Sequence, residues 1–254
     1  MNLLISLRSE ILKTKRTASF YFTLIGAAVV PFIFLLNICM DGLPRQLRKD
    51  PLNAMFKSGA EMNGLVIFPM FVILICTLLP QIEYRNHTWK QVLTSPQAKA
   101  NVFMAKFMNI HLLLVLFLAA YYFFMLVVIV ATHFIDRDLN LLQQPLSGYT
   151  LLVNTVNTYI TILALCALQF LMGLRFKNFI IPIAIGLALW LTGTLLLYKY
   201  QSPLANYFPY SFHIYSVAPE YKSSLNQVAW TSTGSAVLFL MVGFADFRRR
   251  RMNA

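Results

Sequence analysis

The sequence predicts an all-α, polytopic membrane protein with six transmembrane helices. Of its 254 residues, 58% are hydrophobic and only 12% are charged, and the mean hydropathy is +0.64. An ordinary soluble domain carries about 25% charged residues. Six segments are apolar and reach the length of roughly 17–25 residues that a membrane-spanning helix needs. They are residues 18–40, 64–80, 107–132, 151–174, 179–198 and 228–245. Because these segments make up about half of the chain, we expect one membrane domain over residues 1–254 and no soluble catalytic domain.

The net charge of +12 follows from membrane topology rather than from nucleic-acid binding. Basic residues gather in the loops that remain in the cytoplasm. If both termini are cytoplasmic, the inner segments hold 14 of the 21 Lys and Arg residues and the outer loops hold seven. This distribution predicts cytoplasmic N and C termini and no nucleic-acid partner.

Residues 1–17 precede the first span and predict an amphipathic helix at the membrane interface. Leu3, Leu4, Leu7 and Ile11 fall in one arc of a helical wheel, and Lys13 lies on the far side. A basic helix of this kind binds lipid headgroups. An anchoring role and a gating or docking role both remain open. The next polar segment, residues 41–62, is expected to be an outer loop with at most a short helix between its prolines.

A polar, basic stretch at residues 83–106 separates the second span from the third. Trp89, Val92 and Leu93 share one face at helical spacing, which predicts a short amphipathic helix. This face contacts either a partner outside the bilayer or the lipid headgroups. Ser95-Pro96 then opens a new helix that runs to about Thr132. At 1.5 Å per residue this helix is roughly 55 Å long and projects from the membrane into the cytoplasm.

The second half of the chain contains one polar span and one aromatic loop. The polar residues of the fourth span are explained by interhelical hydrogen bonds, with a substrate-facing stripe as the alternative. They are Asn154, Thr155, Asn157, Thr158, Thr161 and Gln169. The outer loop at residues 199–227 is rich in Tyr and Phe. Such a loop forms an aromatic belt at the headgroup level, or a cap of short helices over an outward exit.

Several kinds of chemistry are missing from the sequence. All 30 charged residues lie outside the six predicted spans, whereas ion-coupled transporters and intramembrane enzymes place ionisable groups within the bilayer. The chain has no G-x-x-x-x-G-K-[ST] phosphate loop and no H-E-x-x-H metal motif. Uphill transport would therefore need energy from another polypeptide, and residues 83–106 are well placed for that contact.

Two stretches resemble permease subunits of type-two ATP-binding-cassette (ABC) exporters. They are SEILKTKRT at residues 9–17 and EYRNHTWKQVLTSPQAKANVFMAKF at residues 83–107. The resemblance is closest to the bacteriocin and lantibiotic self-protection permeases. His87 departs from the broader family, which has a glycine before the Thr.

The resemblance implies a subunit of the bacterial cytoplasmic membrane that is not itself an enzyme and has no cofactor of its own. A cytoplasmic ABC ATPase would bind ATP-Mg, and a second permease, identical or paralogous, would complete the membrane part among the lipids. The helix in the cytoplasmic coupling region (residues 81–106) would dock the ATPase. The implied docking residues are Thr88, Trp89, Lys90, Gln91, Val92 and Leu93.

The resemblance also gives the N-terminal helix a part in gating. Its implied gate and coupling residues are Glu83, Glu10, Lys13 and Arg16. We expect Glu83 to pair with Lys13 or Arg16 and so to join the coupling region to the gate. The alternative is a solvated surface ion pair worth under about 1 kcal/mol.

These observations favour a permease that exports an amphipathic peptide, antibiotic or lipid-like compound. Two other functions remain open. One is a membrane anchor or sensor scaffold that recruits a soluble partner through residues 83–106. The other is an intramembrane hydrolase, for which no Ser/His pair stands out.

Overall fold

The computed structural model describes residues 3–15, 17–44, 47–94 and 97–249, and this part of the chain is helical and without strands. Six of its helical segments are long and apolar enough to cross a membrane. The predicted fold class is therefore confirmed. Ser95, Pro96 and Arg16, which carried predictions above, lie outside the described residues.

The first half of the chain contains the first three spanning segments. In order, the elements are α1 (Leu3–Thr14), α2 (Ala18–Asp41), α3 (Pro51–Met62), the π-helix η2 (Asn63–Ile67), α4 (Phe68–Arg85), α5 (Trp89–Thr94) and α6 (Lys99–Ile135). The second half contains η3 (Arg137–Leu139), η4 (Leu141–Gln143), α7 (Gly148–Thr161), α8 (Leu163–Arg175), α9 (Ile180–Tyr198), η5 (Pro203–Tyr207), α10 (Ile214–Val217), η6 (Pro219–Ser224) and α11 (Leu225–Arg249).

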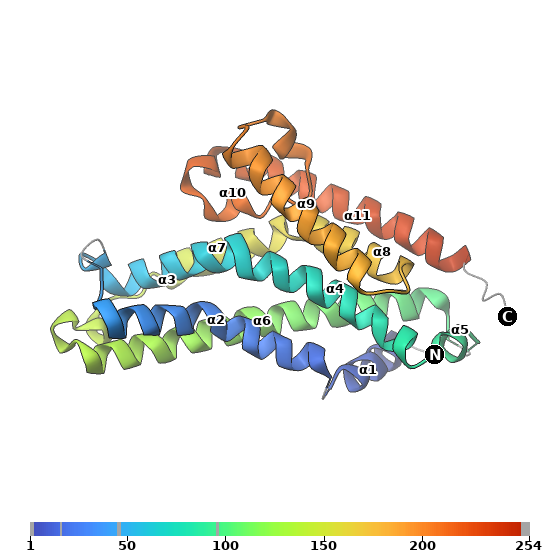
Figure 1. Cartoon of the computed structure of the whole chain (residues 1–254), viewed down its shortest axis with the longest axis horizontal. Coiled ribbons are helices and arrows are strands. Elements are labelled where there is room, and N and C mark those ends of the chain that lie inside the picture. Colours follow the sequence, from blue (N-terminus) through green and yellow to red (C-terminus); the bar gives the residue numbers. More distant parts are fainter. Residues whose placement is uncertain (1–2, 16, 45–46, 95–96, 250–254) are drawn as a thin grey trace.

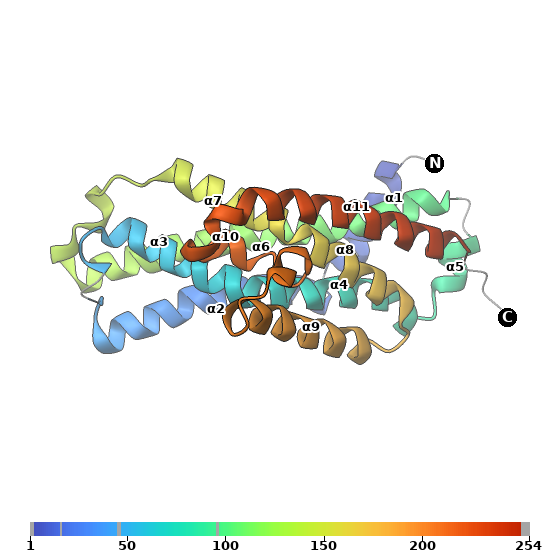
Figure 2. The same cartoon turned by 90° about the horizontal axis from the view of Figure 1, so that it is seen from above.

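The molecule is elongated, and its two ends differ in character (Figures 1 and 2). The short helices α1 and α5 lie at one end, together with the end of α11. The start of α3 and the segment between α6 and α7 lie at the opposite end. The two end helices of the described chain thus reach the same end as α5, as the predicted topology requires.

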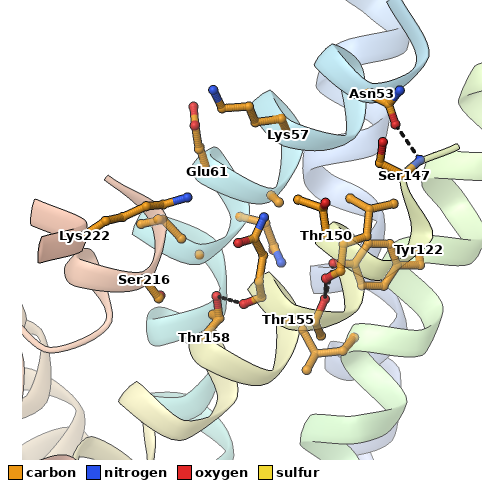
Figure 3. A pocket seen from close by; sticks show the side chains of 17 residues that line it. Asn53, Lys57, Glu61, Tyr122, Ser147, Thr150, Thr155, Thr158, Ser216 and Lys222 are labelled. Atoms are coloured by element: carbon orange, nitrogen blue, oxygen red, sulfur yellow. Dashed lines mark hydrogen bonds between the residues drawn. The ribbon is translucent and has the colours of Figure 1, made fainter. Parts of the chain in front are cut away.

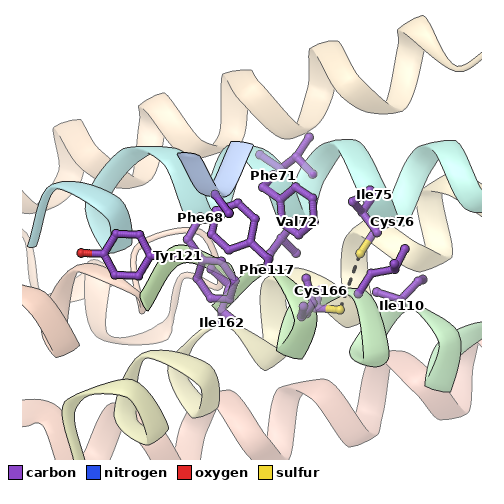
Figure 4. Close-up of a cluster of buried hydrophobic side chains, with 14 of the residues drawn as sticks. Phe68, Phe71, Val72, Ile75, Cys76, Ile110, Phe117, Tyr121, Ile162 and Cys166 are labelled. Atoms are coloured by element: carbon purple, nitrogen blue, oxygen red, sulfur yellow. Dashed lines mark hydrogen bonds between the residues drawn. The ribbon is translucent and has the colours of Figure 1, made fainter. Parts of the chain in front are cut away.

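The core lies where α4, α6 and α8 meet, and Figure 4 shows its centre. The ring of Phe117 stacks on Phe71 with centroids 4.3 Å apart, and Phe68 lies 5.5 Å away. Cys76 and Cys166 are free thiols with their sulfur atoms 3.5 Å apart. The cysteines at these two buried positions pack as small hydrophobic residues.

The expected outer loop at residues 41–62 is largely helical. The α3 helix continues through η2 into α4, so that Pro51–Arg85 forms one segment of 35 residues. Proline is favoured at the first position of a helix, where its missing N–H is not needed. Leu52, Met55, Phe56 and Gly59 are buried at helical spacing along one face of α3. This amphipathic face explains why the short helix is extended.

The long helix predicted to end at about Thr132 is present as α6, which is continuous over 37 residues to Ile135. Its predicted start at Pro96 is wrong, because Ala98 is extended and α6 begins at Lys99. The fourth span, in contrast, is divided into α7 and α8 at Ile162. The Ser232 hydroxyl donates to the carbonyl of Ile160 at 2.8 Å and accepts from the N–H of Ala164 at 3.3 Å. A side chain of α11 therefore satisfies backbone groups at the break.

The aromatic loop at residues 199–227 folds back against the bundle as the short helices η5, α10 and η6. Tyr210 and Phe212 are fully buried, so the belt interpretation is wrong for them. The Tyr210 hydroxyl donates to Gln169 Oε1 at 2.7 Å. Gln169 Nε2 donates to Thr77 Oγ1 at 3.0 Å, which confirms an interhelical hydrogen bond from the polar fourth span.

Gly173 allows α8 to cross α4 with their backbones in contact. A Cβ at this position would overlap the carbonyl oxygen of Cys76 and lie 3.1 Å from Thr77 Cα. We expect Gly173→Ala to cost about 1–3 kcal/mol, because the neighbouring backbone must move. Gly234→Ala is the matched control, since a Cβ there meets nothing within 4 Å. Thermal unfolding in detergent measures both variants, and equal midpoints would contradict the prediction.

Candidate functional site

The α1 helix turns its polar side toward the rest of the protein. Ser6, Glu10 and Thr14 are buried, whereas Leu4 is 74% exposed. Its partner is α6, which supplies polar groups: Asn109 Nδ2 donates to Thr14 Oγ1 at 2.7 Å. The predicted apolar arc is thus the outward side of α1, where Leu4 and Ile11 are exposed, and the polar side holds α1 in position.

Two acidic and two basic side chains meet between α1, α4 and α6, and we call Glu10, Lys13, Glu83 and Lys106 the ion cluster. Lys106 Nζ lies 2.9 Å from Glu10 Oε2 and also contacts Glu83 Oε1. Lys13 Nζ lies 2.7 Å from Glu10 Oε1 and 3.2 Å from Glu83 Oε1. The predicted contact between Glu83 and Lys13 is present. Its two acids and two bases give the ion cluster a formal charge of zero.

Three of the four members of the ion cluster are buried and Lys13 is partly exposed, so a solvated surface ion pair is the wrong description. Glu83 is 1% exposed and Lys106 is 2% exposed. Burial raises the pKa of Glu10, but the charges of Lys106 and Lys13 outweigh this effect and leave the pKa below its usual 4.5. Burial lowers the pKa of Lys13, but Glu10 and Glu83 outweigh it and leave the pKa above its usual 10.5. Glu10 and Lys13 therefore remain charged at neutral pH.

One carboxylate oxygen of the ion cluster lacks a partner. Both lysines contact Oε1 of Glu83, whereas the buried Oε2 accepts no hydrogen bond from the described residues. Leaving a buried polar atom without a hydrogen bond lowers stability by about 1–3 kcal/mol, and by more when the group is charged. The contacts of Glu83 are therefore concentrated on one of its two carboxylate oxygens.

The sequence interpretation missed Lys106. We placed it just outside the third span, but the structure buries it in α6 between Phe103 and Phe107, which are also buried. A lysine at the start of a long apolar run needs an acidic partner. The signal was present in Glu83, which ends the apolar run on the other side of the same connection.

The Trp89 side chain faces inward rather than toward a partner. Its indole is 5% exposed and packs on Tyr84, with ring centroids 5.2 Å apart, and on Phe247, at 6.1 Å. Lys106 Nζ lies 5.6 Å from the centroid of the same ring, within the range of a cation–π contact. The expectation that the Trp89 face points away from the domain is therefore wrong. Trp89 is covered by the chain itself, and its ring joins α5 to the ion cluster.

The other predicted docking residues lie in or next to α5. The N–H of Thr88 donates to the carbonyl of Glu83 at 3.0 Å, and Val92 packs partly buried on the core. Gln91 is exposed. The side chains of Lys90 and Leu93 lie outside the described residues. The exposed side chains of α5 that the structure describes, Gln91 and Thr94, are polar.

The α1 and α5 helices adjoin each other at this end of the molecule. A cleft of about 180 Å³ lies between them, and its lining includes Ser6 and Glu10 of α1 and Gln91 of α5. The Ser6 hydroxyl donates to Gln97 Oε1 at 2.9 Å. Gln97 lies between α5 and α6, so α1 also contacts the segment that precedes α6. Among the residues placed by the structure, no group of three or more His, Cys, Asp or Glu could hold a metal ion.

Comparison with known proteins gives one family. The model of the family described as ABC-2 family transporter protein matches residues 6–193, about three quarters of the chain. The match includes all four members of the ion cluster and the whole of α5. A search of curated proteins gave no significant match.

Proposed function

Because the chain belongs to the ABC-2 family of transporter proteins, and is thus a membrane component of an ABC transporter, we propose that the polar side of α5 docks its ATPase subunit. The ATPase is a separate cytoplasmic protein that binds ATP-Mg, and the chain itself is no enzyme. The transporter moves an amphipathic peptide, antibiotic or lipid-like compound outward through a bacterial cytoplasmic membrane. Two permeases, identical or paralogous, form its membrane part. Self-protection against a bacteriocin is the role that the sequence resemblance favours.

The observation that carries this proposal is the buried ion cluster beside α5. An ion pair buried in protein is costly to separate, because breaking it leaves an uncompensated charge away from water. Such a cluster changes between a few discrete pairings instead of deforming continuously. It therefore suits the transmission of a movement between rigid helices.

The contacts provide a direct path for this movement. A push on the outward side of α5 displaces Trp89, whose ring lies over Lys106. A displaced Lys106 exchanges its contacts with Glu10 and Glu83, and Glu10 belongs to α1. The N-terminal helix then shifts along α6. Trp89 is the anchor of the docking helix in this mechanism, and Gln91 and its neighbours contact the ATPase.

Cysteine labelling in cells tests both on which side of the membrane α5 lies and whether the ATPase covers it. In a Cys39→Ala background, Gln91→Cys and Gln143→Cys place one exposed thiol at each end of the molecule. A membrane-impermeant maleimide should label Gln143→Cys in intact cells and Gln91→Cys only after permeabilisation. Co-expression of the ATPase subunit should slow the labelling of Gln91→Cys alone.

Two results would overturn the proposal. One is labelling of Gln91→Cys in intact cells, which would put α5 on the outer side. The other is ATP-independent transport by the purified chain in vesicles. Protection of Gln91→Cys by an ATPase that drives no transport would instead favour the scaffold function.

A further inference from the structure

A polar cavity lies in the half of the molecule away from α5. It has a volume of about 330 Å³ and is lined by α3, η2, α6, α7 and the segment from α10 to η6 (Figure 3). Asn154 and Thr158 of α7 line it, so part of the polar stripe of the fourth span faces this space. None of the ion cluster contributes to the lining.

Asn63 provides the cavity with a buried acceptor that has no partner. This residue is 4% exposed, and its Oδ1 accepts no hydrogen bond from the residues that the structure describes. Asn63 begins η2, and π-helical turns are frequent at functional sites. Buried polar atoms are nearly always paired in native proteins. Asn63 also lines the cavity, so a hydrogen-bond donor bound there could satisfy this oxygen.

Three charged side chains gather at the same cavity. Lys57 and Glu61 lie on α3, and Lys222 reaches toward them from η6 (Figure 3). No ion pair joins these three within the described part of the chain. The two lysines complement a negatively charged phosphate, and the glutamate complements a positively charged group attached to it. The three charges together therefore suit a zwitterionic headgroup.

A second, apolar cavity of about 540 Å³ adjoins the first between α6 and α7. It is open on its outer side, where Leu126, Leu152 and Val156 are exposed. Leu118, Tyr122, Leu151 and Thr155 line both cavities. The hydroxyl groups of Tyr122 and Thr155 are hydrogen-bonded to each other in this shared wall. Both volumes lie in the range of about 300–1,000 Å³ that is usual for ligand sites. The two cavities together have one polar part and one apolar part.

We propose that the two cavities form one binding site for a zwitterionic amphiphile with a single acyl chain. The headgroup lies in the polar cavity, with its phosphate near Lys57 and Lys222, its ammonium group near Glu61 and a hydroxyl group donating to Asn63. The acyl chain lies in the apolar cavity between α6 and α7. This inference deepens the proposed function by giving the amphipathic substrate a site. Binding needs no ATPase, so it is tested separately from transport.

Photo-crosslinking locates the bound amphiphile. The probe is myristoyl lysophosphatidylcholine with a diazirine near the end of its chain, added to the full chain in proteoliposomes. We expect crosslinks in residues 115–126 and 148–159 that unlabelled lysophosphatidylcholine displaces. Crosslinks spread evenly over the lipid-facing sides of α9 and α11 would show an ordinary lipid shell and overturn the proposal.

A pair of tryptophan variants tests the apolar cavity. Ala119 lies exposed in the wall of this cavity, and Ala184 lies exposed on α9. Ala119→Trp should lower the displaceable crosslinking about tenfold, because the indole occupies the place of the acyl chain. Ala184→Trp should leave it unchanged. Equal crosslinking in the two variants would contradict the assignment.

Asn63→Leu separates a binding role from a structural one. Replacing a buried acceptor that has no partner should raise the thermal midpoint of the ligand-free protein, while the displaceable crosslinking falls. A lower midpoint with unchanged crosslinking would make Asn63 a structural residue and contradict the proposal.

Lys57→Gln tests the position of the headgroup. It should weaken crosslinking of the phosphocholine probe but not of an uncharged monoacylglycerol probe. Equal effects on the two probes would contradict the assignment of the phosphate to Lys57.

Discussion

Lys106→Met is expected to destabilise the protein by about 3–5 kcal/mol. The substitution preserves most of the side-chain volume but removes the positive charge that two carboxylates share. Glu10 would keep its contact with Lys13, and Glu83 would keep one contact at 3.2 Å. Glu83 is almost fully buried, so its charge would remain poorly compensated in a nearly water-free site.

Unfolding in detergent, followed by circular dichroism, measures this loss. Lys13→Met is the matched control, because its side chain is 34% exposed and water can replace part of what is lost. The control should therefore cost clearly less. The double variant Lys106→Met/Glu83→Gln should recover much of the stability, since it removes the uncompensated charge together with its partner.

Equal losses in Lys106→Met and Lys13→Met would mean that burial does not govern the ion cluster. An additive loss in the double variant would mean that Lys106 and Glu83 do not interact. Either result would remove the physical basis for transmission through these side chains. Recovery of stability without recovery of transport is the outcome that we expect, because the double variant keeps the fold but lacks the exchangeable charges.

The parts of the fold that depend on local pattern could be predicted from the sequence. Spans are long apolar runs, and α6 has neither proline nor glycine to interrupt it between Lys99 and Ile135. The extension of α3 into α4 was missed because its polar residues concealed a buried face of Leu52, Met55 and Phe56. The break at Ile162 depends on Ser232, a residue 70 positions further along the chain. Local pattern contains no signal for such a contact.

The sequence predicted which residues belong to the candidate site better than it predicted the direction in which their side chains point. Glu83 and Lys13 could be paired because an acid and a base each flank a span at the same membrane side. The direction of Trp89 could not be predicted, because a helical wheel gives the apolar side of α5 but not the element that covers it. Trp89 is covered by Phe247 of α11 and by Tyr84 of α4. For the same reason, the apolar side of α1 was predicted correctly while the role of its polar side was not.

Trp89→Ala is expected to detach α5 while the rest of the chain stays folded. Replacing a buried Trp by Ala typically costs about 3–5 kcal/mol. A helix of six residues cannot hold its own structure in water without tertiary contacts. The loss should therefore appear as local opening. Hydrogen–deuterium exchange should become fast in residues 88–94 and remain slow in α4 and α6.

The matched control is Trp230→Ala, because Trp230 is 81% exposed on α11 and far from the packing around Trp89. It should leave exchange in residues 88–94 unchanged. With α5 detached, ATP hydrolysis by the partner subunit should continue while ATP-driven transport falls, because the ATPase would move a helix that no longer contacts Lys106. Transport at the wild-type rate in Trp89→Ala, with α5 shown to be open, would exclude α5 as the coupling element. The ATPase would then have to act on the chain through another of the segments at this end.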